Sequence, residues 1–300
     1  MNVRDLEYAL ALRAAGQFGK AAQRCGVSQP TLSTQIAKLE SSLGVRLFER
    51  GPRGVTATPV GERVLTKARG VLEAMEQLRA EACESAAVWR GPLRLGVIAT
   101  AGPYVMPHVL PTITRHQPAA QLLIREGLTD SLLERLHHLE LDAAIVSPPI
   151  ASAGLVVEAL GVEPFVLAVP RRHALAKRDA VRLADLADES LLLLEEGHCL
   201  RAQAIGFCPT DGRPQESFQA SSLESLRQMV AAGIGPTLLP KLATVHNAPR
   251  LRGLVLRPFR EPTPTRTLSL VWRRSSPRGP ALRALAEAIR EPLGKALAKA

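Results

Sequence analysis

Aromatic side chains are scarce in this sequence, and no apolar run is long enough to span a membrane. Only 3% of the 300 residues are Phe, Trp or Tyr, although apolar residues make up 46% and can fill the cores of two or three domains. A membrane helix needs about 20 consecutive apolar residues. Asp5 and Glu7, close to the start, argue against a secretory signal. We therefore expect a protein of the cytoplasm with no membrane partner.

Cysteine is also rare, with four residues in the chain. Thiols stay reduced in the cytoplasm, so a disulfide here would regulate the protein rather than staple its fold. The net charge of +10 favours an anionic partner, and nucleic acid comes before a membrane surface because no amphipathic lysine-rich anchor is present. A host whose proteins are generally basic would give the same excess, so charge alone does not decide.

The first 58 residues show short helices followed by a basic turn. Gly26 is placed to end one helix, and Ser28 to cap the next, with Pro30 tolerated in its first turn. The apolar residues of that helix recur at intervals of four, three and four: Leu32, Ile36, Leu39 and Leu43. Residues 50–54 are a basic, glycine-rich turn of the kind found in a wing. The pattern predicts a winged helix-turn-helix that binds double-stranded DNA.

The same pattern selects the residues that would touch DNA. The polar outer face of the second helix of the motif is predicted to enter the major groove, where hydroxyl and amide groups meet base edges; its residues are Gln29, Pro30, Thr31, Ser33, Thr34 and Lys38. Arg4, Arg50 and Arg53 are predicted to reach phosphates or the minor groove. Contact with phosphate or solvent alone is the alternative for members of both sets.

Residues 59–90 are predicted to form a linker helix, whose pattern runs from Pro59 to about Val88. Small and apolar residues recur every three or four positions: Val60, Val64, Ala68, Val71, Met75, Leu78 and Ala82. About 30 residues give a helix of roughly 45 Å, which is longer than one small domain covers. The stripe is therefore expected to pair with a second copy of the chain, although packing within its own chain is the alternative.

From residue 91 onwards, strands alternate with helices, and the expected strands include 93–99, 165–169, 190–194 and 267–272. This alternation predicts an α/β regulatory domain with buried parallel strands. We expect two Rossmann-like subdomains, the first of about 91–163 and 267–300 and the second of about 164–266, because the late strand 267–272 can return to the first sheet.

Two stretches resemble a known family. FGKAAQRCGVSQPTLSTQIAKLE (18–40) and LGVRLFER (43–50) resemble the DNA-binding domain of LysR-type transcription regulators, and the linker helix and two-part regulatory domain match the same architecture. Within that family, GHCLRAQAIGFC (197–208) resembles the redox segment of the OxyR hydrogen-peroxide regulators. Three further stretches support this: MNVRDLEY (1–8), GPYVMPH (102–108) and SLESLRQMVAAG (222–233).

The resemblance implies a homodimer that assembles into a homotetramer on promoter DNA and activates antioxidant genes with RNA polymerase. Hydrogen peroxide would oxidise the chain and a thiol reductant would reset it, in the cytoplasm and at the nucleoid. We expect no cofactor, no metal and no enzymatic turnover.

The two cysteines of the redox segment are unequal. Residues 200–207 are predicted to form a short helix, so Cys199 would face the positive end of its dipole, whereas Cys208 follows its last turn beside Pro209. Cys199 is therefore predicted to attack peroxide and Cys208 to resolve the sulfenic acid. An intact helix holds the two Cα atoms about 13 Å apart, whereas a disulfide needs less than about 7 Å. Oxidation must then refold the segment.

Other interpretations of the cysteines stay open. A metal site is disfavoured because no fourth ligand is evident near His198, and two inert buried thiols are the plainer alternative. Cys25 and Cys83 are expected to be passive.

Peroxide needs hydrogen-bonding groups around the thiolate. By resemblance, Thr100, Thr129 and His198 form this pocket, although each threonine is also a plausible cap or turn residue. Ser217 lies where the OxyR regulators often have a histidine, and its hydroxyl would supply part of the same hydrogen bonding. Arg266 matches a position that helps to settle the refolded segment, and a solvated arginine is its alternative.

Two rival functions remain. Most LysR-type proteins bind a small metabolite between the regulatory subdomains, and a catalytic thiol peroxidase would use the same cysteines. The helix-turn-helix argues against the peroxidase, and the cysteine pair argues for peroxide over a metabolite.

Overall fold

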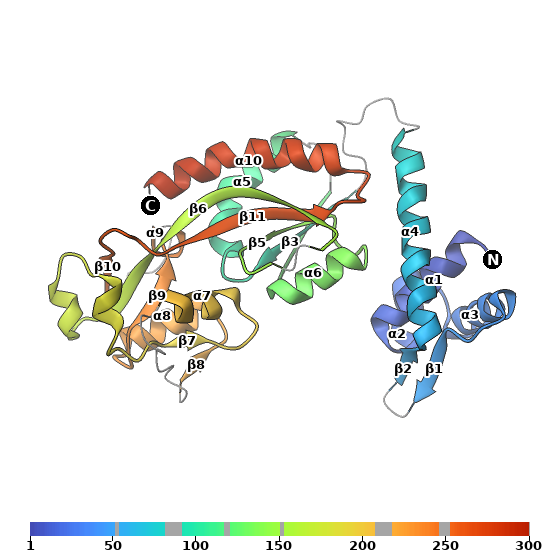
Figure 1. Ribbon diagram of the computed structural model, residues 1–300, viewed down its shortest axis with the longest axis horizontal. Coiled ribbons are helices and arrows are strands. Elements are labelled where there is room, and N and C mark those ends of the chain that lie inside the picture. The colour runs from blue at the N-terminus through green and yellow to red at the C-terminus, as the bar shows by residue number, and fades with distance from the viewer. Residues whose placement is uncertain are drawn as a thin grey trace. The chain divides into compact units, whose positions relative to one another are not determined.

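The computed structural model describes residues 1–51, 54–81, 92–116, 121–150, 153–207, 218–245 and 253–299 (Figure 1). The chain divides into two units, residues 1–86 with 275–277 and residues 87–274 with 278–300. No helix of the described ranges is long and apolar enough to cross a membrane.

The first unit is a winged helix-turn-helix followed by a long helix. Its elements are α1 (Val3–Ala15), α2 (Phe18–Cys25), α3 (Gln29–Leu43), the antiparallel hairpin β1 (Phe48–Gly51) and β2 (Gly54–Ala57), and α4 (Pro59–Glu81). Gly16, Gly26 and Gly44 end the three helices in the left-handed conformation that glycine adopts without strain. Ser28 caps α3 by accepting a hydrogen bond from the Thr31 amide, as the sequence predicted.

The long helix α4 leaves the core of this unit after its first turns. Leu65 and Ala68 are buried, whereas Val71 and Leu78 are 47% and 72% exposed. At its start, a Cβ on Gly61 would lie 2.1 Å from the carbonyl oxygen of Leu47, so only glycine allows this close approach. The predicted helix is therefore confirmed from Pro59 to Glu81, and its expected end near Val88 lies outside the described residues.

The second unit is built on a seven-stranded mixed sheet. Its strands are β3 (Leu93–Ile98), β4 (Leu122–Gly127), β5 (Ala143–Val146), β6 (Leu155–Pro170), β9 (Thr237–Pro240), β10 (Leu254–Pro258) and β11 (Thr265–Arg273). The order is β10-β6-β11-β5-β3-β4, and β9 pairs with β6. Helices α5 (Gly102–His116) and α10 (Gly279–Lys299) pack on one another beside the long β6–β11 pair (Figure 1). Helix α6 (Thr129–His137) connects β4 to β5.

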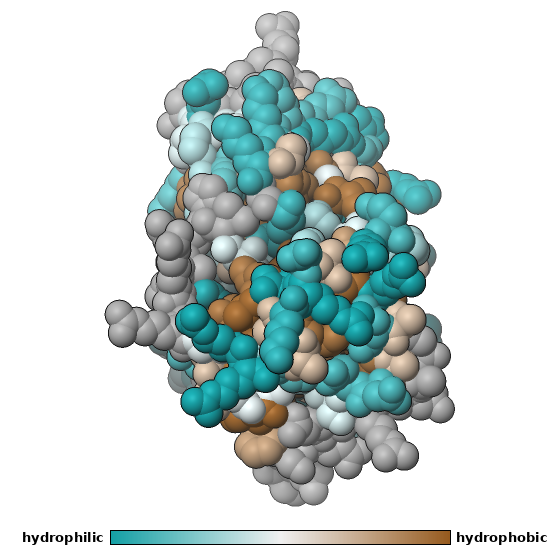
Figure 2. Space-filling view, turned by 90° about the vertical axis from the view of Figure 1, so that its left-hand side faces the viewer, coloured by the Kyte–Doolittle hydropathy of each residue, from teal (hydrophilic) through white to brown (hydrophobic). Residues whose placement is uncertain are grey.

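The remaining elements surround the far half of β6. They are the 3-10 turns η1 (Ala174–Lys177) and η2 (Leu183–Leu186), the short parallel pair β7 (Leu193–Leu194) and β8 (Gln219–Ala220), and helices α7 (Cys199–Phe207), α8 (Leu223–Ala231) and α9 (Leu242–Val245). The end of the unit that carries β10 shows mainly hydrophilic side chains, with apolar ones between them (Figure 2).

Two hydrophobic cores give this unit its two-part α/β architecture. One core lies around β3, β5, β11 and α10, and we call this part subdomain I. The other lies around β9, α8 and the second half of β6, and we call it subdomain II. Strand β6 supplies Leu160 to the first core and Phe165 to the second. The limits expected at 163/164 and 266/267 stay a prediction, since β6 and β11 run through these points without a break.

Several expected details of this unit are wrong. The predicted parallel pairing is confirmed for β3, β4 and β5 and for the short pair β7–β8, whereas β6 and β11 run antiparallel to their neighbours. Strands β3 and β5 are buried as predicted, but β4 is largely exposed. The expected strand 165–169 is the second half of the 16-residue β6. The expected strand 190–194 is reduced to Leu193–Leu194. Tertiary pairing, which local patterns do not report, sets these lengths.

Candidate functional site

Cys199 is the first residue of α7, which begins one residue before the predicted helix 200–207, and only 8% of it is exposed. Its side chain packs in the core of subdomain I, whereas Leu200 and Ala204 of the same helix pack in the core of subdomain II. Gly197, just before the helix, has φ of +89°, a conformation that glycine allows. The thiol therefore lies at the junction of the two subdomains, at the positive end of a helix dipole.

A small cavity opens beside Cys199. Subdomain I lines it with Thr129, Asp130 and Pro149, and the segment 196–205 of subdomain II closes the other side. The volume is about 280 Å³, at the lower limit of the roughly 300–1,000 Å³ of drug-sized ligand sites. The cavity is therefore large enough for a small molecule.

Thr129 offers this cavity an unused hydroxyl. It is the first residue of α6 and is 5% exposed. Its Oγ1 is buried and has no hydrogen-bond partner among the residues that the structure describes. Buried hydroxyls are nearly always hydrogen-bonded in folded proteins, so this group is available to a molecule in the cavity.

His198 also lines the cavity and is half-buried. Burial lowers the pKa of its imidazole, and the nearby charge of Glu195 opposes this only in part. The ring is therefore neutral near pH 7, with one nitrogen that donates a hydrogen bond and one that accepts.

Thr100 and Arg266 belong to a buried network whose residues do not line this cavity. Arg266 donates to Glu163 through Nε (2.8 Å), to the Thr100 hydroxyl through Nη1 (3.2 Å) and to the Thr100 carbonyl through Nη2 (3.1 Å). The second oxygen of Glu163 accepts from the Leu242 amide (2.9 Å). The side chains of Arg266 and Glu163 are 1% and 0% exposed. Arg266 is thus fully buried, not solvated, and Thr100 does not line the described cavity.

Sequence reasoning missed Glu163. It lies 103 residues from Arg266 along the chain, and a single glutamate within a strand carries no local signal of such a partner. The register of β11 on β6 pairs the two residues.

Three predicted site residues, Cys208, Ser217 and Arg53, lie outside the described residues, as does Cys83. The helix before Cys208 is nevertheless described as far as Phe207, whose ring lies 5.4 Å from that of Phe165. Eight helical steps separate the Cα atoms of Cys199 and Phe207 by about 12 Å. The described helix is therefore incompatible with a Cys199–Cys208 bond unless α7 changes.

Most of the predicted DNA-contacting residues are exposed on the first unit. On α3 the exposed residues are Gln29, Pro30, Thr31, Thr34 and Lys38, and on α1 it is Arg4. Ser33 is half-buried, and its hydroxyl accepts a hydrogen bond from Arg50 Nη2 (3.2 Å). The same guanidinium lies 4.5 Å from the centroid of the Phe18 ring. Arg50 thus also attaches the wing to α3 and α2, which sequence reasoning did not anticipate.

Cys25 packs against the core of the first unit and is half-buried. Burial raises the pKa of its thiol, as does the charge of Glu7, and Arg24 opposes the shift. A raised pKa keeps the group as the unreactive thiol.

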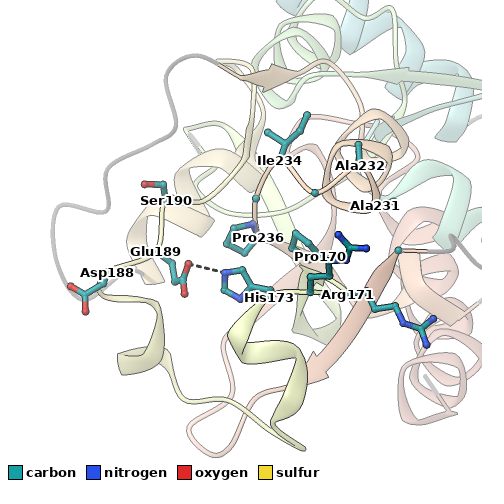
Figure 3. Close-up of a pocket in the computed structure, with 14 residues that line it drawn as sticks. Pro170, Arg171, His173, Asp188, Glu189, Ser190, Ala231, Ala232, Ile234 and Pro236 are labelled. Carbon is teal, nitrogen blue, oxygen red and sulfur yellow. Dashed lines mark ion pairs between the residues drawn. The ribbon is translucent and has the colours of Figure 1, made fainter.

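A larger cavity of about 880 Å³ opens elsewhere on subdomain II (Figure 3). It is lined by residues 170–173, 188–190, 231–236 and 253, all from the same subdomain. Within it, His173 and Glu189 point toward one another, with Nε2 and Oε2 3.2 Å apart (Figure 3). It contains no predicted site residue and does not lie between the subdomains. No group of His, Cys, Asp and Glu suited to a metal occurs among the described residues.

Comparison with family models matches both units. Residues 3–62 match the bacterial regulatory helix-turn-helix proteins of the lysR family, and residues 86–294 match the LysR substrate binding domain.

Curated relatives cover almost the whole chain. The DNA-binding transcriptional dual regulator OxyR of Escherichia coli K12 is 45% identical over 97% of this chain and 95% of that protein. The hydrogen peroxide-inducible genes activator of Haemophilus influenzae is 40% identical over 92% of each.

Solved structures show the same likeness. A full-length OxyR variant from Pseudomonas aeruginosa has a TM-score of 0.80 at 40% identity, and covers 97% of this chain and 95% of that one. A Corynebacterium glutamicum OxyR mutant with H2O2 bound has a TM-score of 0.67 at 33% identity, and covers 99% and 96%.

Proposed function

Since the chain belongs to the LysR family of bacterial transcription regulators, and within it to the OxyR peroxide-responsive regulators, we propose that hydrogen peroxide joins Cys199 to Cys208 in a reversible disulfide that alters promoter binding. The observation that supports this most directly is the position of Cys199 at the first turn of α7, beside a 280 Å³ cavity between the subdomains.

The chemistry proceeds in two steps. The Cys199 thiolate attacks one peroxide oxygen, the O–O bond breaks, and the second oxygen takes a proton and leaves as water, which yields a sulfenic acid. The Cys208 thiol then displaces the sulfenic hydroxyl as a second water and forms the disulfide. A thiol reductant supplies the two electrons that restore both thiols.

The cavity residues have separate roles in this scheme. Cys199, at the first turn of α7, is the thiol that attacks peroxide. The free hydroxyl of Thr129 and the neutral ring of His198 hold the peroxide and help to protonate the departing oxygen. Thr100, Ser217 and Arg266 stay predictions, the first two as further pocket residues and Arg266 as support for the refolded segment.

The disulfide acts on DNA through the shape of the regulatory domain. Joining residues that an intact helix holds about 13 Å apart unwinds α7, which packs on both subdomains, and such a local change of order resets subunit contacts. We place the dimer contact on the exposed side of α4, at Val71 and Leu78, with a homotetramer of two such dimers on promoter DNA. We further propose that the bound protein recruits RNA polymerase to antioxidant genes, and that it acts in the cytoplasm at the nucleoid.

The rival functions fit less well. The cavity between the subdomains contains the predicted reactive thiol Cys199, whereas the larger cavity of 880 Å³ lies within one subdomain and contains no predicted site residue. The curated relatives are named as regulators, and we propose that this chain likewise responds to peroxide without enzymatic turnover.

Peptide mapping by mass spectrometry tests the disulfide. After brief treatment of the reduced protein with hydrogen peroxide, we expect one new cross-linked species that contains Cys199 and Cys208 and disappears with a dithiol reductant. Oxidised protein that carries no such linkage, or carries one through Cys25 instead, would contradict the mechanism.

Removal of one α3 hydroxyl tests the DNA interface. Thr34 is exposed on the predicted groove-facing side of α3, so Thr34→Ala should weaken binding to the preferred operator by about 0.5–1.5 kcal/mol, the value of one hydrogen bond and roughly 2- to 13-fold. Nonspecific DNA binding should change little, because phosphate contacts carry it.

Ser41→Ala serves as the matched control for this measurement. Ser41 is an exposed hydroxyl in the last turns of the same helix, and we expect its removal to leave operator affinity unchanged in fluorescence anisotropy. Equal losses from the two variants would argue against the prediction that residues 29–38 are the part of α3 that contacts the bases.

A further inference from the structure

Gln203 joins the middle of α7 to the other subdomain. Its side-chain amide nitrogen donates to the hydroxyl of Ser147 (2.9 Å) and to the carbonyl of Pro148 (2.6 Å). Both acceptors directly follow β5, the strand at the centre of subdomain I, and Ser147 is fully buried. The two hydrogen bonds therefore connect the helix that carries Cys199 to the end of β5 in subdomain I.

Cys199 and Gln203 lie on the same face of α7. They are four residues apart, which stacks their side chains one helical turn from each other. Cys199 packs into the core of subdomain I, and Gln203 bonds to the same subdomain. This face of the helix is therefore the one that docks across the junction.

The rest of α7 is anchored to subdomain II. Leu200 and Ala204 are in its core, Arg201 donates to the carbonyl of Leu194 (3.1 Å), and Phe207 packs on Phe165. Apolar packing of this kind has no fixed direction, whereas the Gln203 bonds need both the helix and its docked position. Refolding of residues 199–208 removes the turn that presents Gln203 to Ser147.

We propose that Gln203 is a latch for the reduced state, a positioning residue that sets how readily Cys199 and Cys208 join. The inference rests on the proposed disulfide and adds to it the group that opposes its formation. The latch bonds stabilise only the helical, reduced form. Their loss shifts the equilibrium with a thiol buffer toward the disulfide.

Gln203→Glu is the sharpest variant. Glutamate matches glutamine in size and helix propensity, but its carboxylate has no donor for Pro148 and faces that carbonyl oxygen. Each lost hydrogen bond weakens the helical form by about 0.5–1.5 kcal/mol. We therefore expect the ratio of disulfide to dithiol, at fixed glutathione potential, to rise by about tenfold, which equals a reduction potential lower by about 30 mV.

Two further variants separate the latch from general damage. Ser147→Ala removes one acceptor and leaves α7 unchanged in sequence, so it should raise the ratio by a smaller factor and add little to Gln203→Glu. Gln228→Ala removes an amide that bonds to Glu224 (2.9 Å) on the exposed face of α8, and its ratio should equal that of the wild type.

The readout is the fraction of Cys199–Cys208 peptide after acid quenching, with circular dichroism to show that each reduced variant is folded. An unchanged ratio in both Gln203→Glu and Ser147→Ala, with the linkage present in the wild type, overturns the latch and leaves the proposed function intact. Absence of the linkage in the wild type overturns both.

Discussion

Changing Cys199 to serine is expected to abolish the response to peroxide completely. A serine hydroxyl does not ionise near pH 7 and forms no sulfenic acid, so neither the first step nor the disulfide can take place. Operator binding should then be the same before and after hydrogen peroxide. Footprinting on a target promoter, with and without oxidant, measures this directly. The variant should fold as the wild type does, because the hydroxyl replaces a thiol of similar size.

Two other cysteine variants complete this experiment. Cys208→Ser should halt the reaction at the Cys199 sulfenic acid, which a dimedone label detects. Cys25→Ser should respond as the wild type does, since burial raises the pKa of that thiol and it packs against the core of the DNA-binding unit. A peroxide response that survives in Cys199→Ser would favour the rival metabolite regulator.

Loss of the buried carboxylate Glu163 should destabilise the regulatory domain more than any change of a surface charge. Glu163→Gln keeps the size of the side chain but leaves the Arg266 guanidinium, 1% exposed, without its counter-charge. Removal of one partner from a buried ion pair costs about 3–5 kcal/mol. We expect about 3 kcal/mol here because glutamine still accepts the bond from the Leu242 amide. Urea unfolding, followed by circular dichroism, measures the change.

A surface pair offers the matched control. Glu158 Oε2, on β6, lies 2.6 Å from Arg290 Nη2, and the two side chains are 26% and 39% exposed. Exposed ion pairs of this kind contribute about 0–1 kcal/mol to the free energy of unfolding. Glu158→Gln should therefore shift the midpoint little. Similar losses from the two variants would mean that Arg266 is solvated in solution and that the buried network does not form.

Local signals predicted the parts of the structure that local interactions determine. The cap at Ser28 and the glycine at Gly26 fix the ends of helices whatever surrounds them, so the helix-turn-helix is confirmed almost residue for residue. Helix α7 was predicted in the same way, with Cys199 at its first turn.

Long-range interactions explain what the sequence did not predict. No local sequence pattern around Glu163 indicates that it pairs with Arg266. In the same way, no pattern around Gln203 indicates its hydrogen bond to Ser147, 56 residues away. The hydroxyl of Thr100, expected to face peroxide, accepts from Arg266. Its role depends on where β11 lies in the sheet, which only the assembled fold determines.

Strand β6 also limits how the chain can change in length. It runs for 16 residues through both cores, and successive side chains of a strand point to opposite faces. Its pairing with β11 already accommodates one extra residue, Leu160, at a bulge between Leu268 and Ser269. One further insertion or deletion before Phe165 would turn every following side chain to the wrong face. Insertions in the loops around this strand can therefore be tolerated. The length of β6 itself is constrained, because it sets the spacing between the cores of the two subdomains.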